Sequence, residues 1–213
     1  FLSSKHPLIL LPILLLTAHN NLLHLALFCQ DASQNTHITI TPETLAKQSI
    51  PGQNKEKQIM TKVLFICHGN ICRSTMAQFV FQDMVNHAGL ADEFFIDSKA
   101  TSTEEIGNPP HRGTVRKMNE LGIPMQPHFA SQVTKSDYNK FDYIIGMDKW
   151  NYKNMMRIFG GDPDGRVSLL LEFAGSGRDI ADPWYTGNFD DTYRDVKEGC
   201  EALLYKCVGE IKA

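Results

Sequence analysis

The chain has 213 residues, of which 42% are hydrophobic, and this is enough to bury the core of one domain with an appendage. Its net charge is −3, and the region after Gln58 holds 17 of the 21 basic residues and 21 of the 24 acidic ones, which argues against a nucleic-acid footprint. The five cysteines show no zinc-type pairing, so the composition indicates no metal site.

Residues 1–59 differ in composition from the rest of the chain. Pro7–Ala18 consists of twelve apolar or small residues, too few to span a bilayer. Only Lys5 precedes this segment and no Ala-x-Ala site follows it, unlike in a signal peptide. Asp31–Gln58 is polar and rich in Gln, Asn, Thr and Ser, which predicts disorder. We therefore expect residues 1–59 to be a disordered extension or translated upstream sequence, with a secreted form as the alternative, and a domain over residues 60–213.

The stretch Lys62–Ser74 predicts a strand, a tight loop and a helix in direct succession. Val63–Ile66 is a run of strand formers. Gly69 and Asn70 tolerate backbone conformations that other residues avoid. Ser74 is a good N-cap residue, and apolar residues at helical spacing follow it. The loop between the strand and the helix should therefore wrap a small concavity.

This concavity has the chemistry of an oxyanion site with a nucleophile beneath it. Backbone amides of such a loop bind a dianion together with the helix N-terminus, and Arg73 adds a two-point guanidinium contact. Cys67 ends the strand in the same positive field, which favours its thiolate. The loop lacks the Gly-Lys-Ser/Thr ending of a nucleotide-binding loop. A buried structural cysteine at the strand end remains the alternative.

Strands and helices alternate after Met60, which predicts an α/β fold: a single domain with a four-stranded parallel sheet flanked by helices on both faces. The last predicted helix carries an unbroken apolar face that includes Cys200 and Cys207, so we expect both in the core. The predicted strands are Val63–Ile66, Phe94–Asp97, Tyr143–Met147 and Val167–Leu170, and the predicted helices are Ser74–Asn86, Arg112–Glu120, Lys135–Asn139, Lys149–Ile158 and Phe189–Ile211.

Cleavage of a phosphate ester also needs a proton for the leaving oxygen, and Arg178–Tyr185 offers two carboxylates for this task. Pro183 biases Asp182 toward an extended backbone that can point its side chain across the loop. The two aromatic residues that follow are a plausible wall for a phenyl ring. Asp179 is the competitor, without a following proline. On these residues alone, an Asp-Pro turn with no chemistry remains the alternative.

Several motifs of the domain occur together in one known family. They are CHGNICRS at Cys67–Ser74, IDSKATS at Ile96–Ser102, EIGNPP at Glu105–Pro110, LGIPM followed by His128, FDYIIGMD at Phe141–Asp148 and DPWY at Asp182–Tyr185. With them, Met60–Ala213 resembles the low-molecular-weight protein tyrosine phosphatases over essentially its whole length. The resemblance implies hydrolysis of phosphotyrosine in proteins through a cysteinyl-phosphate intermediate, with no metal and no cofactor.

The resemblance implies a role for each matching residue. Cys67 is the expected nucleophile, Arg73 the phosphate clamp, and Asp182 the general acid and base. Asn70 is expected in a left-handed conformation that neighbouring polar groups hold in place. The expected substrate-binding residues are His68, Gly69, Asn70, Ile71, Cys72, Ser74, Trp184 and Tyr185, and the residues expected to support Asn70 are Ser74, Ser98 and His128.

The chain departs from the usual family pattern at three positions. Thr75 stands where proline is usual, and Trp184 where tyrosine is usual. Glu104 occupies a position that often carries an aromatic residue at the pocket rim, so we expect it to alter which phosphopeptides are preferred. A reversible disulfide between Cys67 and Cys72 is a further implication of the resemblance, and simple packing of Cys72 under the loop is its alternative.

Other functions of the same fold remain alternatives. Arsenate reductases need a resolving cysteine pair on a mobile helix, whereas Cys200 and Cys207 fall on the last helix. Protein-arginine phosphatases typically carry threonine where Ile71 stands, and the bulkier isoleucine suits an aryl ester. A non-catalytic phosphate-binding module would be free to lose Cys67 or Asp182, yet the chain keeps both.

The expected partner is a phosphotyrosine-containing protein substrate. Inorganic phosphate and vanadate are the expected inhibitors, and no nucleic acid or membrane is expected for the domain. A nucleophilic thiol favours a reducing compartment, so we expect the protein to be cytoplasmic.

Overall fold

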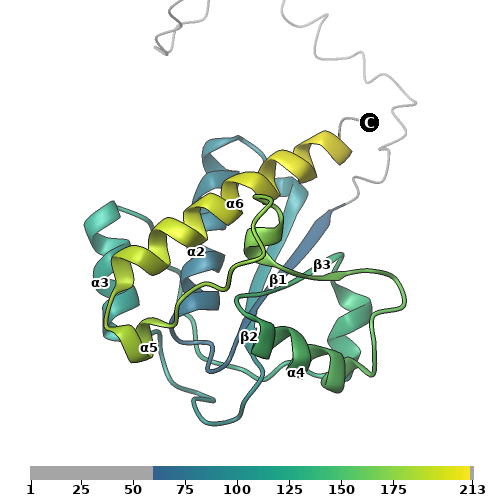
Figure 1. Cartoon of the computed structure of the whole chain (residues 1–213). Helices are drawn as coiled ribbons and strands as arrows, with labels where there is room; N and C mark the ends of the chain where they lie inside the picture. The colour runs from purple at the N-terminus through teal and green to yellow at the C-terminus, as the bar shows by residue number, and fades with distance from the viewer. Residues whose placement is uncertain (1–59, 212–213) are drawn as a thin grey trace, which may run out of the picture. The chain divides into compact units, whose positions relative to one another are not determined.

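Four parallel strands form a sheet in the order β2–β1–β3–β4 in the computed structural model of this protein, which describes residues 60–211 (Figure 1). The strands are β1 (Thr61–Cys67), β2 (Phe94–Ala100), β3 (Tyr143–Gly146) and β4 (Val167–Leu169). Each neighbouring pair is parallel. The predicted four-stranded parallel sheet is therefore confirmed, with all four strands at their predicted places.

The helices also follow the prediction, except that one of them is a 3₁₀ helix and three short elements were not predicted. The α-helices are α2 (Arg73–His87), α3 (Arg112–Leu121), α4 (Lys149–Phe159), α5 (Pro183–Thr186) and α6 (Phe189–Ile211). The predicted helix Lys135–Asn139 is instead the 3₁₀ helix η2 (Lys135–Lys140), closed by a capping box between Thr134 and Asp137. The short helix α5 lies in a stretch that was predicted only as a loop. Two further 3₁₀ turns, η1 (Ala91–Glu93) and η3 (Leu170–Glu172), were not predicted.

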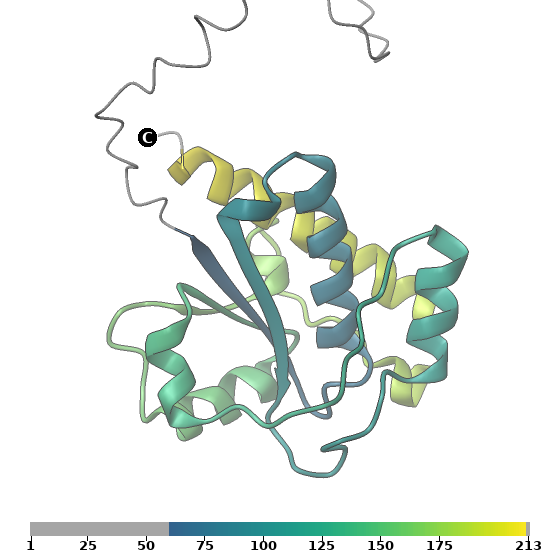
Figure 2. The same cartoon turned by 180° about the vertical axis from the view of Figure 1, so that it is seen from behind.

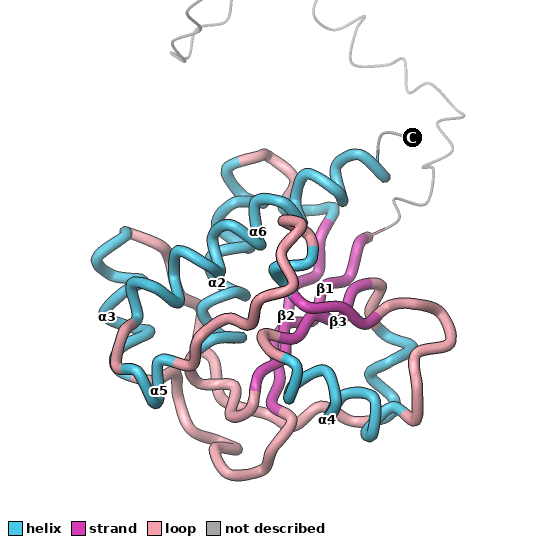
Figure 3. The backbone as a smooth tube through the Cα atoms, in the orientation of Figure 1, coloured by secondary structure: helices cyan, strands magenta, loops and turns pink. Residues whose placement is uncertain are grey.

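Helices cover both faces of the sheet (Figure 2 and Figure 3). The side chains of β1 pack alternately against the helices on one face and on the other. Val63, Phe65 and Cys67 join the buried cluster that includes residues of α2 and α6. Leu64 and Ile66 point to the opposite face and pack in a second cluster with residues of η2 and α4. Because successive side chains of a strand face opposite sides, a central parallel strand with both faces covered is apolar throughout.

The order of the strands brings the functional residues to one edge of the sheet. From β1 the chain passes through α2 to β2 on one side, and it later returns to β3 on the other side of β1. At such a switch point the connections diverge and leave a crevice beyond the carboxyl ends of the two strands. The loops after β1 and β3 therefore meet there, and these loops begin at His68 and Met147.

The expectation for residues 1–59 lies outside the residues that the structure describes. Over residues 60–211, none of the helices combines the length and the apolar character needed to cross a bilayer.

Helix α6 approaches the sheet edge closely at a glycine. A Cβ atom placed on Gly199 would lie 2.5 Å from the Leu170 Cγ atom and 2.9 Å from the Leu170 carbonyl oxygen of η3. On the same helix, a Cβ atom on Gly209 would meet nothing within 4 Å. Alanine substitutions at the two glycines therefore separate the effect of steric crowding on stability from the effect of helix propensity.

We predict opposite effects on stability for Gly199→Ala and Gly209→Ala. Overpacking against η3 costs about 1–3 kcal/mol and outweighs the gain in helix propensity at position 199, so the free energy of unfolding should fall. At position 209 only the propensity gain remains, about 0.5 kcal/mol. Urea unfolding of both variants tests this, and equal midpoints would contradict the close packing of α6 on η3.

Candidate active site

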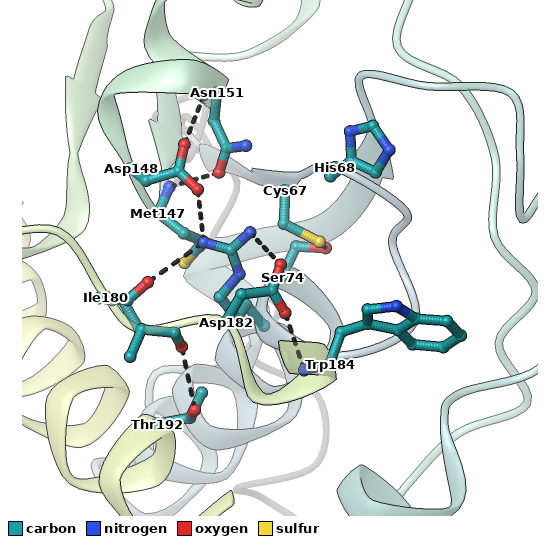
Figure 4. Close-up of polar contacts among 12 residues, drawn as sticks. Cys67, His68, Ser74, Met147, Asp148, Asn151, Ile180, Asp182, Trp184 and Thr192 are labelled. Carbon is teal, nitrogen blue, oxygen red and sulfur yellow. Dashed lines mark hydrogen bonds and ion pairs between the residues drawn. The ribbon is translucent and has the colours of Figure 1, made fainter. Parts of the chain in front are cut away.

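Cys67 lies at the C-terminal end of β1, directly before the loop of residues 68–72 and close to the first turn of α2 (Figure 4). Its side chain is buried, with an exposed fraction of 3%. The sulfur lies 3.0 Å from the Ser74 hydroxyl and accepts the backbone N–H of Asn70 at 3.2 Å. The sulfur is therefore held between the loop and the first turn of α2.

Asn70 fixes the shape of the loop. Its φ of 58° is the only positive φ of a non-glycine residue within residues 60–211, in agreement with the predicted left-handed conformation. Its Nδ2 donates to Ser74 Oγ at 3.0 Å and to Ser98 Oγ at 2.8 Å. Its Oδ1 lies 3.2 Å from both His128 Nε2 and the Ser131 amide, which donates to it. Burial lowers the pKa of His128, so at neutral pH the ring is neutral and can donate through Nε2. These contacts hold a conformation that would otherwise be unfavourable.

Asn70 and Ser74 were expected to contact the substrate, but the structure places both away from the pocket. Both are completely buried, and neither lines the pocket at the loop. They lie behind the loop and hold it in place. The other loop residues expected at the substrate do line the pocket: His68, Gly69, Ile71 and Cys72.

The loop leaves backbone donors unused. Among residues 60–211, the amides of Gly69, Ile71 and Cys72 have no hydrogen-bond acceptor. The same loop leads into the N-terminus of α2, where the helix dipole adds positive potential. Free amides at a helix N-terminus bind phosphate-like anions.

Arg73 is a buried cation at the centre of a polar network. Its Nη1 donates to Asp148 Oδ2 at 2.5 Å and to the Ile180 carbonyl at 3.1 Å, and its Nη2 donates to Asp182 Oδ2 at 2.6 Å. Burial acts to lower the pKa of Arg73, but the negative charges of Cys67, Asp182 and Asp148 outweigh it and raise this pKa. Its Nε is buried and has no acceptor among the described residues. One guanidinium donor is therefore still free for a ligand.

Asp182 lies at the N-terminus of α5, with both carboxylate oxygens engaged. Oδ2 accepts from Arg73, and Oδ1 accepts the amide of Trp184 at 3.0 Å, as an N-cap does. Its φ of −83° and ψ of 115° are extended, as predicted from the following Pro183. The Thr192 hydroxyl of α6 holds the segment by donating to the Ala181 carbonyl at 3.1 Å.

Asp179, the competitor from the sequence, lies elsewhere. It is exposed, accepts the amide of Lys149 at 3.2 Å, and does not line the pocket. The geometry therefore favours Asp182 over Asp179 as the carboxylate that acts at Cys67.

A pocket of about 300 Å³ opens above Cys67 and Arg73. Trp184 and Tyr185 of α5 form one wall, and they are 56% and 83% exposed. Trp150, Asn151 and Asn154 of α4 line it too, as do Glu104 and Glu105 of the loop after β2. Charged groups thus lie at the floor, and aromatic and acidic side chains lie at the mouth.

Cys72 and Cys67 are both free thiols in the structure, and their environments differ. Burial, followed by the negative charges of Cys67 and Asp182, raises the pKa of Cys72 to about 12. Cys72 is therefore a neutral thiol at neutral pH. The predicted core positions of Cys200 and Cys207 are confirmed, since both are buried.

Five residues that line the pocket were given no role in the sequence analysis: Glu105, Asp148, Trp150, Asn151 and Asn154. Asp148 lay in a recognised motif but received no role, although it directly follows a predicted strand, where the sheet edge gathers polar side chains. Trp150 had no signal, because an aromatic residue in the first turn of a predicted helix is more often part of a core.

Comparisons with known proteins agree with this geometry. The family model described as low molecular weight phosphotyrosine protein phosphatase matches residues 62–213. The low molecular weight protein-tyrosine-phosphatase YfkJ of Bacillus subtilis is 40% identical over 147 residues, covering 68% of this chain and 94% of the relative. The human low molecular weight phosphotyrosine protein phosphatase is 37% identical over 164 residues, covering 70% of this chain and 98% of the relative.

Solved structures give the same result. The crystal structure of YfkJ from Bacillus subtilis matches with a TM-score of 0.69 and 39% identity, covering 71% of this chain and 96% of that one. A structure described as a Drosophila arginine phosphatase matches with a TM-score of 0.62 and 27% identity, covering 68% and 97%. The chain belongs to the low molecular weight phosphotyrosine protein phosphatase family.

Proposed function

We propose that this protein hydrolyses phosphotyrosine in proteins, with Cys67 as nucleophile, Arg73 as phosphate clamp and Asp182 as general acid and base. The observation that carries the proposal is the unused, buried Nε donor of Arg73, a residue that lines the same pocket as Cys67. A buried donor without an acceptor is rare in proteins and points to a ligand that supplies one. The free loop amides supply further donors to the same ligand.

In the first step the Cys67 thiolate attacks phosphorus in line with the tyrosine oxygen. The S–P bond forms as the bond from phosphorus to the phenolic oxygen breaks, and the carboxylic acid of Asp182 gives its proton to that oxygen. The loop amides and Arg73 hold the three equatorial oxygens. The products of this step are a dephosphorylated tyrosine residue in the substrate protein and a cysteinyl-phosphate on Cys67.

In the second step water releases the phosphate. The Asp182 carboxylate takes a proton from the water molecule, whose oxygen attacks phosphorus as the S–P bond breaks. The thiolate of Cys67 and inorganic phosphate are released, and Asp182 is again protonated. The contact between Asp182 and Arg73 supports this role, because it keeps the carboxylate above the group that binds the phosphoryl oxygens.

An aryl ester is the substrate class that the walls support best. Trp184 and Tyr185 offer aromatic surface to a flat ring, and Ile71 adds an apolar contact. Phosphoarginine is the second candidate, because relatives of this fold include an arginine phosphatase. The aromatic wall favours phosphotyrosine. The partner is a phosphotyrosine-containing protein, with inorganic phosphate and vanadate as inhibitors of the same pocket.

We place the reaction in the cytoplasm and assign it to residues 60–213 alone. The support for the compartment is the set of free thiols, since the nucleophile has to stay reduced. The support for the domain is that all residues of the proposed mechanism lie within residues 67–182. Residues 1–59 are, in this proposal, an extension without a part in catalysis.

The first prediction compares substrates and tests Cys67. The wild-type chain should hydrolyse a phosphotyrosine peptide far faster than phosphoserine or phosphoarginine peptides.

Cys67→Ser should abolish turnover and still bind vanadate, because the loop amides and Arg73 remain. Phosphate release and vanadate titration measure both effects. Turnover by Cys67→Ser would exclude Cys67 as nucleophile, and a phosphoarginine preference would change the assigned substrate.

The second prediction tests Asp182 through the leaving group. The phenol of tyrosine has a pKa of about 10 and leaves poorly without a proton, whereas nitrophenol needs less help. Asp182→Asn should therefore slow the first step far more on a phosphotyrosine peptide than on p-nitrophenyl phosphate. With the base also lost, the cysteinyl-phosphate should accumulate and appear as added mass on the Cys67 peptide after rapid quenching.

Asp179→Asn is the matched control for this experiment, and it should leave both rates unchanged. The pH dependence of kcat/KM should lose the limb of the protonated acid only in Asp182→Asn. Equal losses on both substrates with an unaltered pH profile would show that another residue is the acid.

A further inference from the structure

The mouth of the pocket carries more negative charge than a site for a dianion should tolerate. Four carboxylates line the pocket, against one guanidinium. Asp148 and Asp182 both pair with Arg73, so their charge is compensated at the floor. Glu104 and Glu105 remain at the mouth, where they repel an incoming phosphate. Their presence therefore calls for an explanation other than phosphate binding.

Both glutamates are held against the loop of residues 68–72. The Glu104 carboxylate lies 3.0 Å from His68 Nε2. The stem of Glu105 packs over Gly69, where an added Cβ atom would lie 3.0 Å from Glu105 Cγ. The Glu105 carboxylate accepts from Asn108 at 2.7 Å. These contacts keep two carboxylates beside residues that directly follow the nucleophile, so a peptide entering the pocket has to pass them.

The wall formed by α4 carries a further group that attracts cations, as the two glutamates do. Trp150 lines the pocket and is 70% exposed, although tryptophan is on average a well-buried residue. The Lys153 ammonium lies 5.2 Å from the centroid of this ring, so one face already accepts a cation. An indole face attracts arginine and lysine side chains, and arginine stacks on it particularly well.

We propose that the mouth of this pocket selects phosphotyrosine segments with lysine or arginine next to the phosphotyrosine, and that Glu104, Glu105 and Trp150 are the specificity-determining residues. The inference rests on the proposed phosphatase function. A flanking cation gains from both glutamates and from the indole, and it offsets their repulsion of the phosphate. A flanking acidic residue adds to that repulsion and is rejected.

The test uses two phosphotyrosine peptides that differ only in the residues beside the phosphotyrosine, lysine in one and glutamate in the other. The wild-type chain should show a kcat/KM about threefold to tenfold higher for the lysine peptide at low salt. High salt should shrink the ratio, because exposed charges are screened.

Glu104→Gln/Glu105→Gln isolates the carboxylates, since it keeps their shape and removes their charge. The variant should lose most of the peptide preference: kcat/KM should fall for the lysine peptide and rise for the glutamate peptide. The matched control is Asp92→Asn/Glu201→Gln, which removes two charges from η1 and α6, away from the pocket. This control should keep the wild-type ratio.

Trp150→Ala should raise KM for the lysine peptide about twofold to fivefold, with a smaller effect on p-nitrophenyl phosphate. Trp150→Phe, which keeps an aromatic face, should recover part of this loss. A lysine-to-glutamate ratio near one in the wild-type chain, or a ratio that the two glutamine substitutions leave intact, would overturn the inference while the enzyme still turns over. Absence of turnover on every phosphotyrosine peptide would instead overturn the proposed function.

Discussion

The buried guanidinium of Arg73 is the constraint on which the rest of the site depends. A cation with an exposed fraction of 3% is tolerated only when paired and hydrogen-bonded. Its hydrogen bonds join three parts of the fold: the first turn of α2, which carries Arg73, Asp148 at the start of α4, and the Ile180–Asp182 segment before α5. Removing one partner of a buried pair costs about 3–5 kcal/mol, so the three parts are strongly held in register. The same pairing leaves the Nε of Arg73 without an acceptor. One side chain therefore both stabilises the site and offers a donor to a bound anion.

The sequence alone was sufficient where chemistry and local structure coincide. The strand ending at Cys67, the loop and the helix after it follow from a run of strand formers and Gly69, and all are present. The predicted N-cap was wrong: α2 is capped at Cys72, and Ser74 lies inside its first turn with its hydroxyl against the Cys67 sulfur. Asp182 could be placed as extended because proline restricts the residue before it. The order of the strands and the roles of Asp148 and Trp150 could not be derived from local patterns, because they depend on which loops the fold brings together. The 3₁₀ form of η2 was missed for a related reason: its capping box closes after one turn, and local spacing alone reads as an α-helix.

The site also shows how one loop separates two tasks between neighbouring residues. Asn70 and Ser74 face inward and hold the loop, whereas His68 and Gly69 face the pocket and fix the glutamates at its mouth. The inner residues therefore determine whether phosphate can be bound. The outer ones act on what surrounds the phosphate in a protein substrate. Such a division allows the mouth to change in charge without disturbing the geometry around Cys67.

The partners of Arg73 have one more consequence, which concerns protein synthesis. They lie 75, 107 and 109 residues further along the chain. A ribosome makes the N-terminal part first, so the nucleophile and its loop emerge long before the groups that anchor the arginine. A nascent chain that ends before residue 180 contains the reactive cysteine but lacks both Asp182 and the Ile180 carbonyl. The hydrogen bonds around Arg73 are therefore complete only when synthesis of the domain is nearly finished.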